Sequence, residues 1–417
     1  MRERYVYQSM DRGSHLTTDP RRCTASHSNT GILLKSGFHE EILIFSGSLT
    51  HSRYDLKITE VQATLHRVPV EVPLLSEKIT TSVLFAKVET DEGIIGYGLT
   101  RGAQRFGLRE FINRELAPFL RDKNPLETER VWQQLYTAFN PRGQTGMWSS
   151  AVSAIDIALW DIKGKKYNEP VWRLLGGAHN PVQSYVTFGL KQYSTEQLIE
   201  VAKQVVAQGE KRLKMVVAVD PENPGVDAAR VRAVRRAVGD EVELMIDANY
   251  LFSFNRALEL CKLVEPYNIT WFEEPVYQND ALLLADLRRH TSIPIAAGQN
   301  EGHRYRHREL IVNRGVDIAQ PNVCSVGGYT EAVKVAALAQ AFNLPIANGG
   351  GWPHHNMHLQ AAMSNGWRVE FHFEMWGIGD KIYREPPAPD QGWVTMPEKP
   401  GLGLEPRWDA LTEFEEK

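Results

Sequence analysis

Four polar residues stand at or near the ends of successive apolar segments in the middle of the chain. Lys214 lies in the run KRLKMVVAV, and the next segments carry Asp247 in ELMID, Glu273 in TWFE and Gln299 in IPIAAGQ. The last three are spaced regularly, 26 residues apart. Carboxylate and amide oxygens are the ligands that Mg²⁺ prefers. One such residue alone would more often be a helix cap or an ion-pair partner, but the regular spacing favours a metal site.

Lys214 raises a separate question, because its neighbours in the run are mostly apolar and a buried ammonium group is costly to desolvate. The cost is offset where the lysine is paired with carboxylates, points into a cavity, or is neutral part of the time. Such a lysine is a candidate general acid or base. We therefore expect Lys214 to point toward Asp247, one strand away.

These residues belong to a repeating pattern of short apolar strands and amphipathic helices. Eight strand-like runs begin 23 to 31 residues apart, near Ser184, Arg212, Glu243, Ile269, Ile293, Asp317, Leu344 and Trp367. The first intervening helix, STEQLIEVAKQVVAQ, opens with a capping box from Ser194 to Gln197. Eight repeated βα units predict an α/β fold with a parallel barrel, whose chemistry takes place at the carboxyl ends of the strands.

The chain divides into four regions. Residues 55–177 mix alternating strand patterns with helical segments, which predicts an α+β domain, and residues 178–383 should form the barrel. Residues 384–417 are rich in proline and glycine and should pack back on the α+β domain. Residues 1–54 are rich in Arg, Ser, Thr and His without clear periodicity, so we expect a flexible N-terminal extension, with a transit peptide as the alternative.

The composition argues against several classes of partner. A net charge of -4 without a basic block offers no electrostatic footprint for nucleic acid or for an acidic membrane surface. No apolar run approaches the roughly 18 residues needed to span a bilayer. Cys23, Cys261 and Cys324 are widely spaced and match no zinc or disulfide pattern, which suits a reducing compartment. We therefore expect a cytoplasmic protein that acts on a small molecule.

Residues 57–410 resemble the enolase superfamily, and within it the mandelate racemase-like group that contains many acid-sugar dehydratases. MIDAN, WFEEP and GQNE occur in the order of the three metal-ligand strands, AQPNVCSVGGYTEA falls on the sixth strand and WRVE on the eighth. The helix AVSAIDIALWDIKGKKYNEPVWRLLGG is similar to the group's domain-joining segment. The resemblance implies a modified (β/α)₇β barrel with an N-terminal α+β capping domain, one Mg²⁺ per subunit, a small-molecule carboxylate substrate and a symmetric homo-oligomer.

The resemblance also implies removal of the proton α to a carboxylate, which gives an enediolate. That proton is too weakly acidic for an unaided side chain, so a divalent ion must neutralise the developing oxyanion while a positioned lysine or histidine takes the proton. In a dehydratase the enediolate then expels the β-hydroxyl group. In a racemase it is reprotonated on the opposite face.

The strands that carry the lysine and the third metal ligand depart from the group's pattern. Val216 stands where the group has the second lysine of its Lys-x-Lys pair, which leaves Lys214 as the leading acid/base candidate. The alternative is that Arg212 and Lys214 form a shifted pair. The third metal ligand, normally Glu, is Gln299, whose amide oxygen can bind Mg²⁺ but adds no charge. Glu301 could reach the ion and restore the charge, or could make a local ion pair.

The sixth to eighth strands depart from the pattern as well. Asn322 replaces the Asp of an Asp-His dyad, and the usual histidine position falls among the glycines of LPIANGGGWPHHN. His354 or His355 could supply the second acid or base, or could simply begin a helix. Glu370 matches the acid that hydrogen-bonds the substrate carboxylate in the racemase, a role that requires a raised pKa; a buried structural carboxylate is the alternative. Further candidates for substrate binding are Asn249, Arg101, His303, Glu77 and Lys78.

Three functions are compatible with these residues. The leading one is Mg²⁺-dependent dehydration of a sugar acid, an aldonate or aldarate, to a 2-keto-3-deoxy acid. The second is a racemase, epimerase or cycloisomerase on the same scaffold; a racemase normally needs acid/base groups on both faces of the enediolate, which Val216 and Asn322 argue against. The third is a non-catalytic, metal-binding relative.

Overall fold

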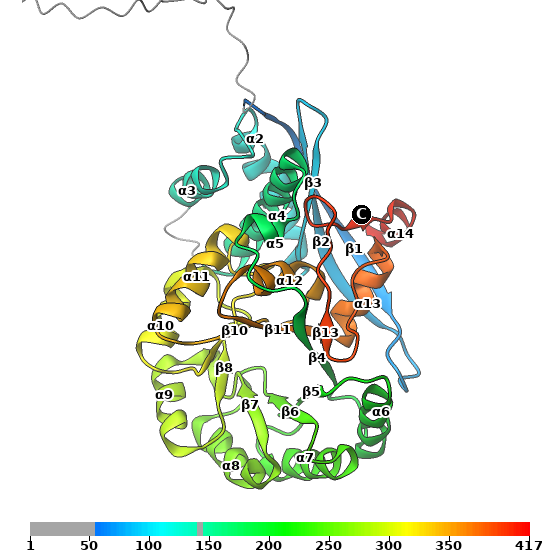
Figure 1. The fold of residues 1–417 in the computed structure, drawn as a ribbon, viewed down its shortest axis with the longest axis vertical. Coiled ribbons are helices and arrows are strands. Elements are labelled where there is room, and N and C mark those ends of the chain that lie inside the picture. Colours follow the sequence, from blue (N-terminus) through cyan, green and yellow to red (C-terminus); the bar gives the residue numbers. More distant parts are fainter. Residues whose placement is uncertain (1–54, 140–144) are drawn as a thin grey trace, which may run out of the picture. The chain divides into compact units, whose positions relative to one another are not determined.

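The computed structural model of the chain describes residues 55–139 and 145–417. The extension predicted for residues 1–54 lies outside the described residues. Figure 1 shows an N-terminal sheet with its helices, followed along the chain by a ring of strands with helices on the outside.

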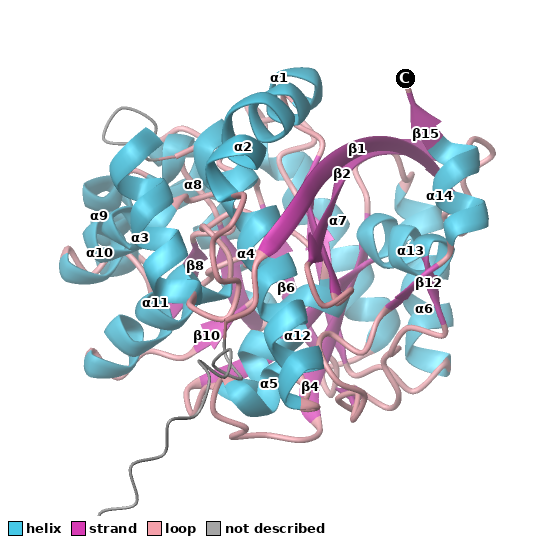
Figure 2. Cartoon of the chain, turned by 90° about the horizontal axis from the view of Figure 1, so that it is seen from above, coloured by secondary structure: helices cyan, strands magenta, loops and turns pink. Residues whose placement is uncertain are grey.

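The N-terminal region is an antiparallel sheet covered by helices. Its strands are β1 (Ile58–Val70), β2 (Ile79–Thr90) and β3 (Ile95–Arg101), in the order β15-β1-β2-β3, where β15 (Glu415–Glu416) comes from the far end of the chain. In Figure 2, β15 lies beside the long bent strand β1. The helical segments are α1 (Arg105–Phe111), the π-helix η1 (Ile112–Leu116), α2 (Ala117–Leu120), α3 (Thr128–Phe139) and α4 (Met147–Tyr167).

Helix α4 packs directly on β3, and two glycines make this contact possible. A Cβ atom at Gly96 would lie 2.1 Å from the carbonyl oxygen of Ala158, and one at Gly98 would lie 1.8 Å from that of Ala154. Only glycine permits so close an approach of strand and helix backbones. This fixes the helix that leads from the N-terminal sheet to the short helix α5 (Val171–Leu174) and the barrel.

The barrel consists of eight parallel strands, as predicted. They are β4 (Val182–Gly189), β5 (Arg212–Val216), β6 (Glu243–Asp247), β7 (Ile269–Glu273), β8 (Ile295–Ala297), β9 (Ile318–Ala319), β10 (Ile346–Ala347) and β11 (Gly366–His372). Pairing of β11 with β4 closes the ring. The prediction of a modified barrel with an N-terminal α+β region is confirmed.

Helices alternate with the barrel strands on the outside of the ring (Figure 1). The predicted capping box is present, since Ser194 Oγ accepts from the Gln197 backbone N–H while the Gln197 side chain accepts from the Ser194 N–H. The helices are α6 (Thr195–Ala207), α7 (Pro224–Val238), α8 (Phe254–Val264), α9 (Ala281–His290), α10 (His303–Val312), α11 (Tyr329–Ala341), α12 (Pro353–Ala362) and, after the last strand, α13 (Phe373–Ile382).

A layer of apolar side chains closes the inside of the barrel. It comprises Tyr185, Met245, Trp271, Ala296, Ile318 and Ala347, one from each of six strands. Because side chains on a strand alternate with a period of two, the residue two positions later on each strand faces the same interior, one layer nearer the carboxyl end. Those positions are Thr187, Asp247 and Glu273 within their strands, and Gly298, Gln320 and Gly349 just past the ends of β8, β9 and β10. The strand pattern therefore builds a mostly polar layer directly above an apolar floor.

The C-terminal segment contacts both the barrel and the N-terminal sheet. Strand β13 (Trp393–Val394) pairs with β4, and β12 (Tyr383–Arg384) pairs with β14 (Glu405–Pro406). Helix α14 (Trp408–Phe414) and β15 then lie against β1. Among residues 55–139 and 145–417, none of the helices combines the length and apolar character needed to cross a membrane.

Candidate active site

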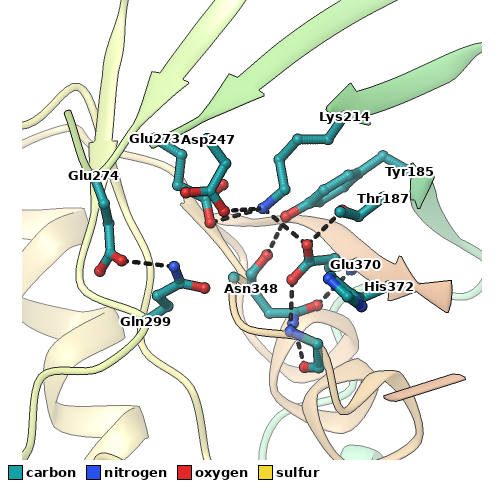
Figure 3. A network of polar contacts seen from close by, with 12 residues as sticks. Tyr185, Thr187, Lys214, Asp247, Glu273, Glu274, Gln299, Asn348, Glu370 and His372 are labelled. Carbon is teal, nitrogen blue, oxygen red and sulfur yellow. Dashed lines mark hydrogen bonds and ion pairs between the residues drawn. The ribbon is translucent and has the colours of Figure 1, made fainter. Parts of the chain in front are cut away.

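The ammonium group of Lys214 lies among three carboxylates at the carboxyl end of the barrel (Figure 3). Its Nζ is 2.7 Å from Glu273 Oε1, 2.8 Å from Glu370 Oε1 and 3.2 Å from Asp247 Oδ2. Lys214 and Glu273 are fully buried, and the other two are nearly so. We call these four residues the lysine–carboxylate cluster. The three carboxylates offset the cost of burying the lysine.

The charges within this cluster determine which groups hold protons. Burial lowers the pKa of Lys214, but the carboxylates, Glu273 first, outweigh it and hold that pKa well above its ordinary value. Burial also raises the pKa of Glu273 well above its ordinary value, despite the opposing charge of Lys214. For Glu370, burial is outweighed by Lys214 and His372, and its pKa is lowered. The direction of this shift and the 2.8 Å contact with Lys214 favour the buried, ion-paired carboxylate that the sequence left as the alternative for Glu370.

Glu370 is held rigidly by its surroundings. Its Oε1 accepts a hydrogen bond from the Thr187 hydroxyl group, and its Oε2 accepts one of 2.6 Å from the Gly351 N–H. Its own backbone N–H donates to Asn348 Oδ1 at 2.6 Å. The other end of the cluster is also supported, since Trp271 donates to Glu273 Oε2 at 3.1 Å. Lys214 therefore contacts carboxylates that are themselves fixed in place.

Gln299 makes a contact that the sequence did not suggest. Its Nε2 donates a 2.6 Å hydrogen bond to Oε2 of Glu274, a fully buried residue with a φ of 43°. Burial raises the pKa of Glu274 to about 7, with the charge of Asp247 acting in the same direction. Figure 3 shows the amide oxygen of Gln299 turned away from Glu274. The position of Glu274, directly after Glu273 in WFEEP, was the only signal available.

Glu301 makes ion-pair and amide contacts on the loop after β8. Its Oε2 accepts from Arg306 at 3.0 Å and its Oε1 from Asn279 at 3.3 Å. Asn279 also donates to Glu274, at 2.8 Å. The local ion pair foreseen as one alternative for Glu301 is therefore present, whereas Gln299 presents an oxygen that Glu274 does not occupy.

The donor types fit Mg²⁺, although two of the three donors contact the Lys214 ammonium group. Asp247 and Glu273 are paired neighbours on β6 and β7, and Gln299 follows β8. Within the described part of the chain, no group of three or more His, Cys, Asp or Glu side chains is arranged to hold a metal. Two carboxylates and one amide oxygen would supply the protein ligands, and Lys214 now contacts both of the carboxylates. Hard oxygen donors with room for waters and substrate oxygens suit Mg²⁺.

Three other predicted site residues contact this cluster or the loops at the mouth of the barrel. Asn249 donates its backbone N–H to Asp247 Oδ1 at 2.8 Å. Asn322 donates to the Gly349 carbonyl oxygen at 2.8 Å and so ties β9 to the glycine-rich loop after β10. Arg101, at the end of β3, donates to the side chain of Asn300, which is in turn 3.4 Å from Glu274. Arg101 thus connects the N-terminal domain to the mouth of the barrel.

The structure packs His354 and His355 away from the lysine–carboxylate cluster. Both are buried in α12. The ring of His354 lies edge-on to Phe371 and Tyr383, and the ring of His355 is 3.1 Å from the Tyr383 hydroxyl group. Burial lowers the pKa of His354 to about 4 and that of His355 well below its ordinary value. These contacts give no support to the expectation that either imidazole completes the site.

The remaining predicted residues are not brought to the cluster either. His303 stacks on Tyr305 and lies beside Trp132 and Tyr136 of helix α3 in the N-terminal domain. Glu77 and Lys78 are exposed on the loop between β1 and β2, where Lys78 pairs with Glu71 at 2.8 Å.

The shifted-pair alternative for β5 also lacks support from these contacts. Arg212 pairs with Glu243 at 3.1 Å and donates to the Gly392 carbonyl oxygen. These partners lie at the opposite end of the strand from Val216. Lys214 is therefore the cation that β5 contributes to the carboxyl end of the barrel.

Comparison with known families agrees with this arrangement. Residues 53–176 match the family described as mandelate racemase / muconate lactonizing enzyme, N-terminal domain, and residues 197–410 match enolase C-terminal domain-like proteins. The chain belongs to the mandelate racemase-like group of the enolase superfamily. Arabinonate dehydratase of Saccharolobus solfataricus is 31% identical over 340 residues, which cover 80% of this chain and 90% of that enzyme.

Other members of the superfamily are similar at comparable levels. D-galactarolactone cycloisomerase of Agrobacterium fabrum is 32% identical over 383 residues, which cover 86% of this chain and 99% of that enzyme. The structure of L-talarate dehydratase from Polaromonas sp. JS666, complexed with Mg and L-glucarate, is 30% identical, with a TM-score of 0.78 and coverage of 87% of this chain and 98% of that one. The relatives thus include dehydratases and cycloisomerases that act on sugar acids or their lactones.

Proposed function

We propose that this superfamily member is a Mg²⁺-dependent dehydratase that converts an aldonate or aldarate to a 2-keto-3-deoxy acid. The observation that carries the proposal is the position of Lys214, which lies within 3.2 Å of Asp247, Glu273 and Glu370 at the carboxyl end of the barrel. Several relatives, among them arabinonate dehydratase, support the reaction class.

Asp247, Glu273 and the amide oxygen of Gln299 would hold the metal ion. Bound Mg²⁺ would act as a Lewis acid and stabilise the negative charge that develops on the substrate carboxylate. Glu274 orients the Gln299 amide through its 2.6 Å hydrogen bond. The apolar floor beneath the site, which includes Trp271 and Ile318, excludes water from below.

Lys214 is the group that moves protons in this proposal. The surrounding carboxylates hold it as an ammonium ion, so it can accept the α proton only when their negative charge is neutralised. Once it has taken that proton, the electron pair of the broken C–H bond forms the enediolate. The enediolate then expels the β-hydroxyl group, which takes the proton from Lys214 and leaves as water. The resulting enol takes up a solvent proton at C3 and loses its hydroxyl proton, which gives the 2-keto-3-deoxy acid. One residue thus serves as base and acid on the same face of the substrate.

The test is an assay of purified protein with Mg²⁺ against a panel of aldonates and aldarates. Proton NMR of a reaction run in H₂O should show a 3-deoxy methylene signal in the product. Absence of a 2-keto-3-deoxy product from every acid in the panel would contradict the proposal. Treatment with EDTA should abolish the signal, and added Mg²⁺ should restore it.

A cycloisomerase is the second candidate, because D-galactarolactone cycloisomerase matches over 86% of this chain. Proton abstraction by Lys214 would be the same, but an intramolecular ring oxygen would leave instead of a hydroxyl group. Mass spectrometry separates the two candidates: a dehydratase product has lost one water, whereas a cycloisomerase product has the mass of its substrate.

A further inference from the structure

Gln320 is a fully buried amide in the polar layer of the barrel. It directly follows β9, and its backbone N–H donates to the Ala297 carbonyl oxygen at 3.0 Å. Because Ile318 belongs to the apolar floor, the alternation of the strand places Gln320 in the layer that also contains Asp247 and Glu273. Its side chain is 0% exposed.

The carboxamide of Gln320 has no hydrogen-bond partner in residues 55–139 and 145–417. Neither Nε2 nor Oε1 makes a hydrogen bond there. Leaving a buried polar group unsatisfied costs about 1–3 kcal/mol, and such groups are rare in folded proteins. The neighbouring amides illustrate the contrast, since Gln299 donates to Glu274 and Asn322 donates to Gly349. The unpaired amide of Gln320 therefore differs from both of these nearby amides.

Gly349 shows where the Gln320 amide lies. A Cβ atom at Gly349 would be 2.7 Å from Glu273 Oε1 and 2.9 Å from Gln320 Nε2. The Gln320 amide therefore occupies the space that a side chain on residue 349 would need, beside the oxygen that pairs with Lys214. The absence of a side chain at Gly349, just after β10, thus leaves room for the Gln320 side chain, just after β9.

The geometry points to Gln320 as a substrate-binding residue, whose carboxamide hydrogen-bonds a hydroxyl group of the sugar acid beyond its α carbon. This inference rests on the proposed function. A hydroxyl group both donates and accepts, which matches an amide with its oxygen and its N–H groups all free.

The experiment uses a Lys214→Met background, which prevents turnover. It compares the double variant that also carries Gln320→Leu with Lys214→Met alone. Calorimetry with Mg²⁺ present measures binding of arabinonate, galactonate, galactarate and glycolate, the last of which has no hydroxyl group beyond its α carbon. We expect Gln320→Leu to weaken binding of the sugar acid that binds best by about tenfold or more, and to change glycolate binding less than about twofold.

The matched control is Gln360→Leu. Gln360 is also a fully buried amide with an unpaired Nε2, but its Oε1 accepts from the Trp367 N–H at 3.1 Å, outside the polar layer. This variant should lower the melting temperature and leave sugar-acid binding unchanged. Gln320→Leu should keep or raise the melting temperature of the free protein, because it removes an unsatisfied amide.

Several outcomes would overturn the inference. Unchanged sugar-acid binding in Gln320→Leu would do so while leaving the proposed function intact. An equal loss for glycolate, or a lower melting temperature with unchanged binding, would show that Gln320 supports the layer and does not bind the polyol. If the protein bound none of the acids, both the inference and the proposed function would fail.

Discussion

Gln299 donates a 2.6 Å hydrogen bond to Glu274, and this contact decides which atom of the amide is free. With Nε2 held, Oε1 is the atom available to Mg²⁺. We expect Glu274→Gln to weaken Mg²⁺ binding about tenfold or more, because partners of metal ligands orient them and tune their affinity. Isothermal calorimetry with Mg²⁺ measures the change. Equal affinity in the variant and the unmodified protein would remove Glu274 from the site.

Glu301→Gln is the matched control for that experiment, and it also tests the alternative third ligand. Glu301 is engaged by Arg306 and Asn279, so its loss should change Mg²⁺ affinity by less than about threefold, through screened charge effects alone. A tenfold loss would identify Glu301 as the ligand in place of Gln299.

Lys214→Met should abolish turnover, because it removes the proposed proton carrier. Mg²⁺ affinity should be retained or increased, since the ammonium group no longer competes for Glu273 and Asp247. Lys211→Met, at an exposed lysine three residues earlier, is the control and should behave like the unmodified protein. Steady-state assays and Mg²⁺ calorimetry measure the two effects. Activity that survived within a few fold would make Lys214 structural.

His354→Gln and His355→Gln test whether a second acid or base acts from α12. Both rings pack near Tyr383, so we expect kcat to stay within about threefold in each variant. Both variants should have lower melting temperatures, because each removes a buried ring contact. A loss of about a hundredfold or more in kcat without a change in KM would restore that histidine as a proton donor or acceptor.

Asp156 should make folding stability fall with rising pH. Burial raises its pKa from 3.8 to about 7, while its Oδ2 accepts from the Thr330 N–H at 2.9 Å. The folded protein therefore binds the proton more tightly than the unfolded chain. The stability that this provides is complete below the unfolded pKa and is lost as the pH rises to about 7.

Calorimetric melting between pH 4 and pH 8 measures this effect. Asp156→Asn, which keeps an acceptor oxygen but does not titrate, should reduce the fall in stability by up to about 4 kcal/mol, an upper bound from the size of the shift. Asp240→Asn, at an exposed aspartate, should leave the profile unchanged. A profile for Asp156→Asn that matched the unmodified protein would contradict the assignment.

Sequence periodicity was sufficient to predict the barrel and the position of its active end. Each of the eight strands begins within two residues of the start expected for it, because burial imposes a local pattern of alternating and apolar residues that one strand displays by itself. The spacing of Asp247, Glu273 and Gln299 likewise follows from one residue per βα unit. Lys214 was expected to lie near Asp247, and the register of β5 and β6 brings the two side chains together.

The partners of each side chain were decided by the tertiary structure. Glu274 and Gln320 look ordinary in the sequence, yet one holds the Gln299 amide and the other fills the space beside Gly349. His354 and His355 looked available, yet α12 packs them against Tyr383. Sequence determined which residues face the interior of each strand, because that depends on local alternation. Which of them meet depends on strand register and loop path across the closed barrel, which are properties of the whole fold.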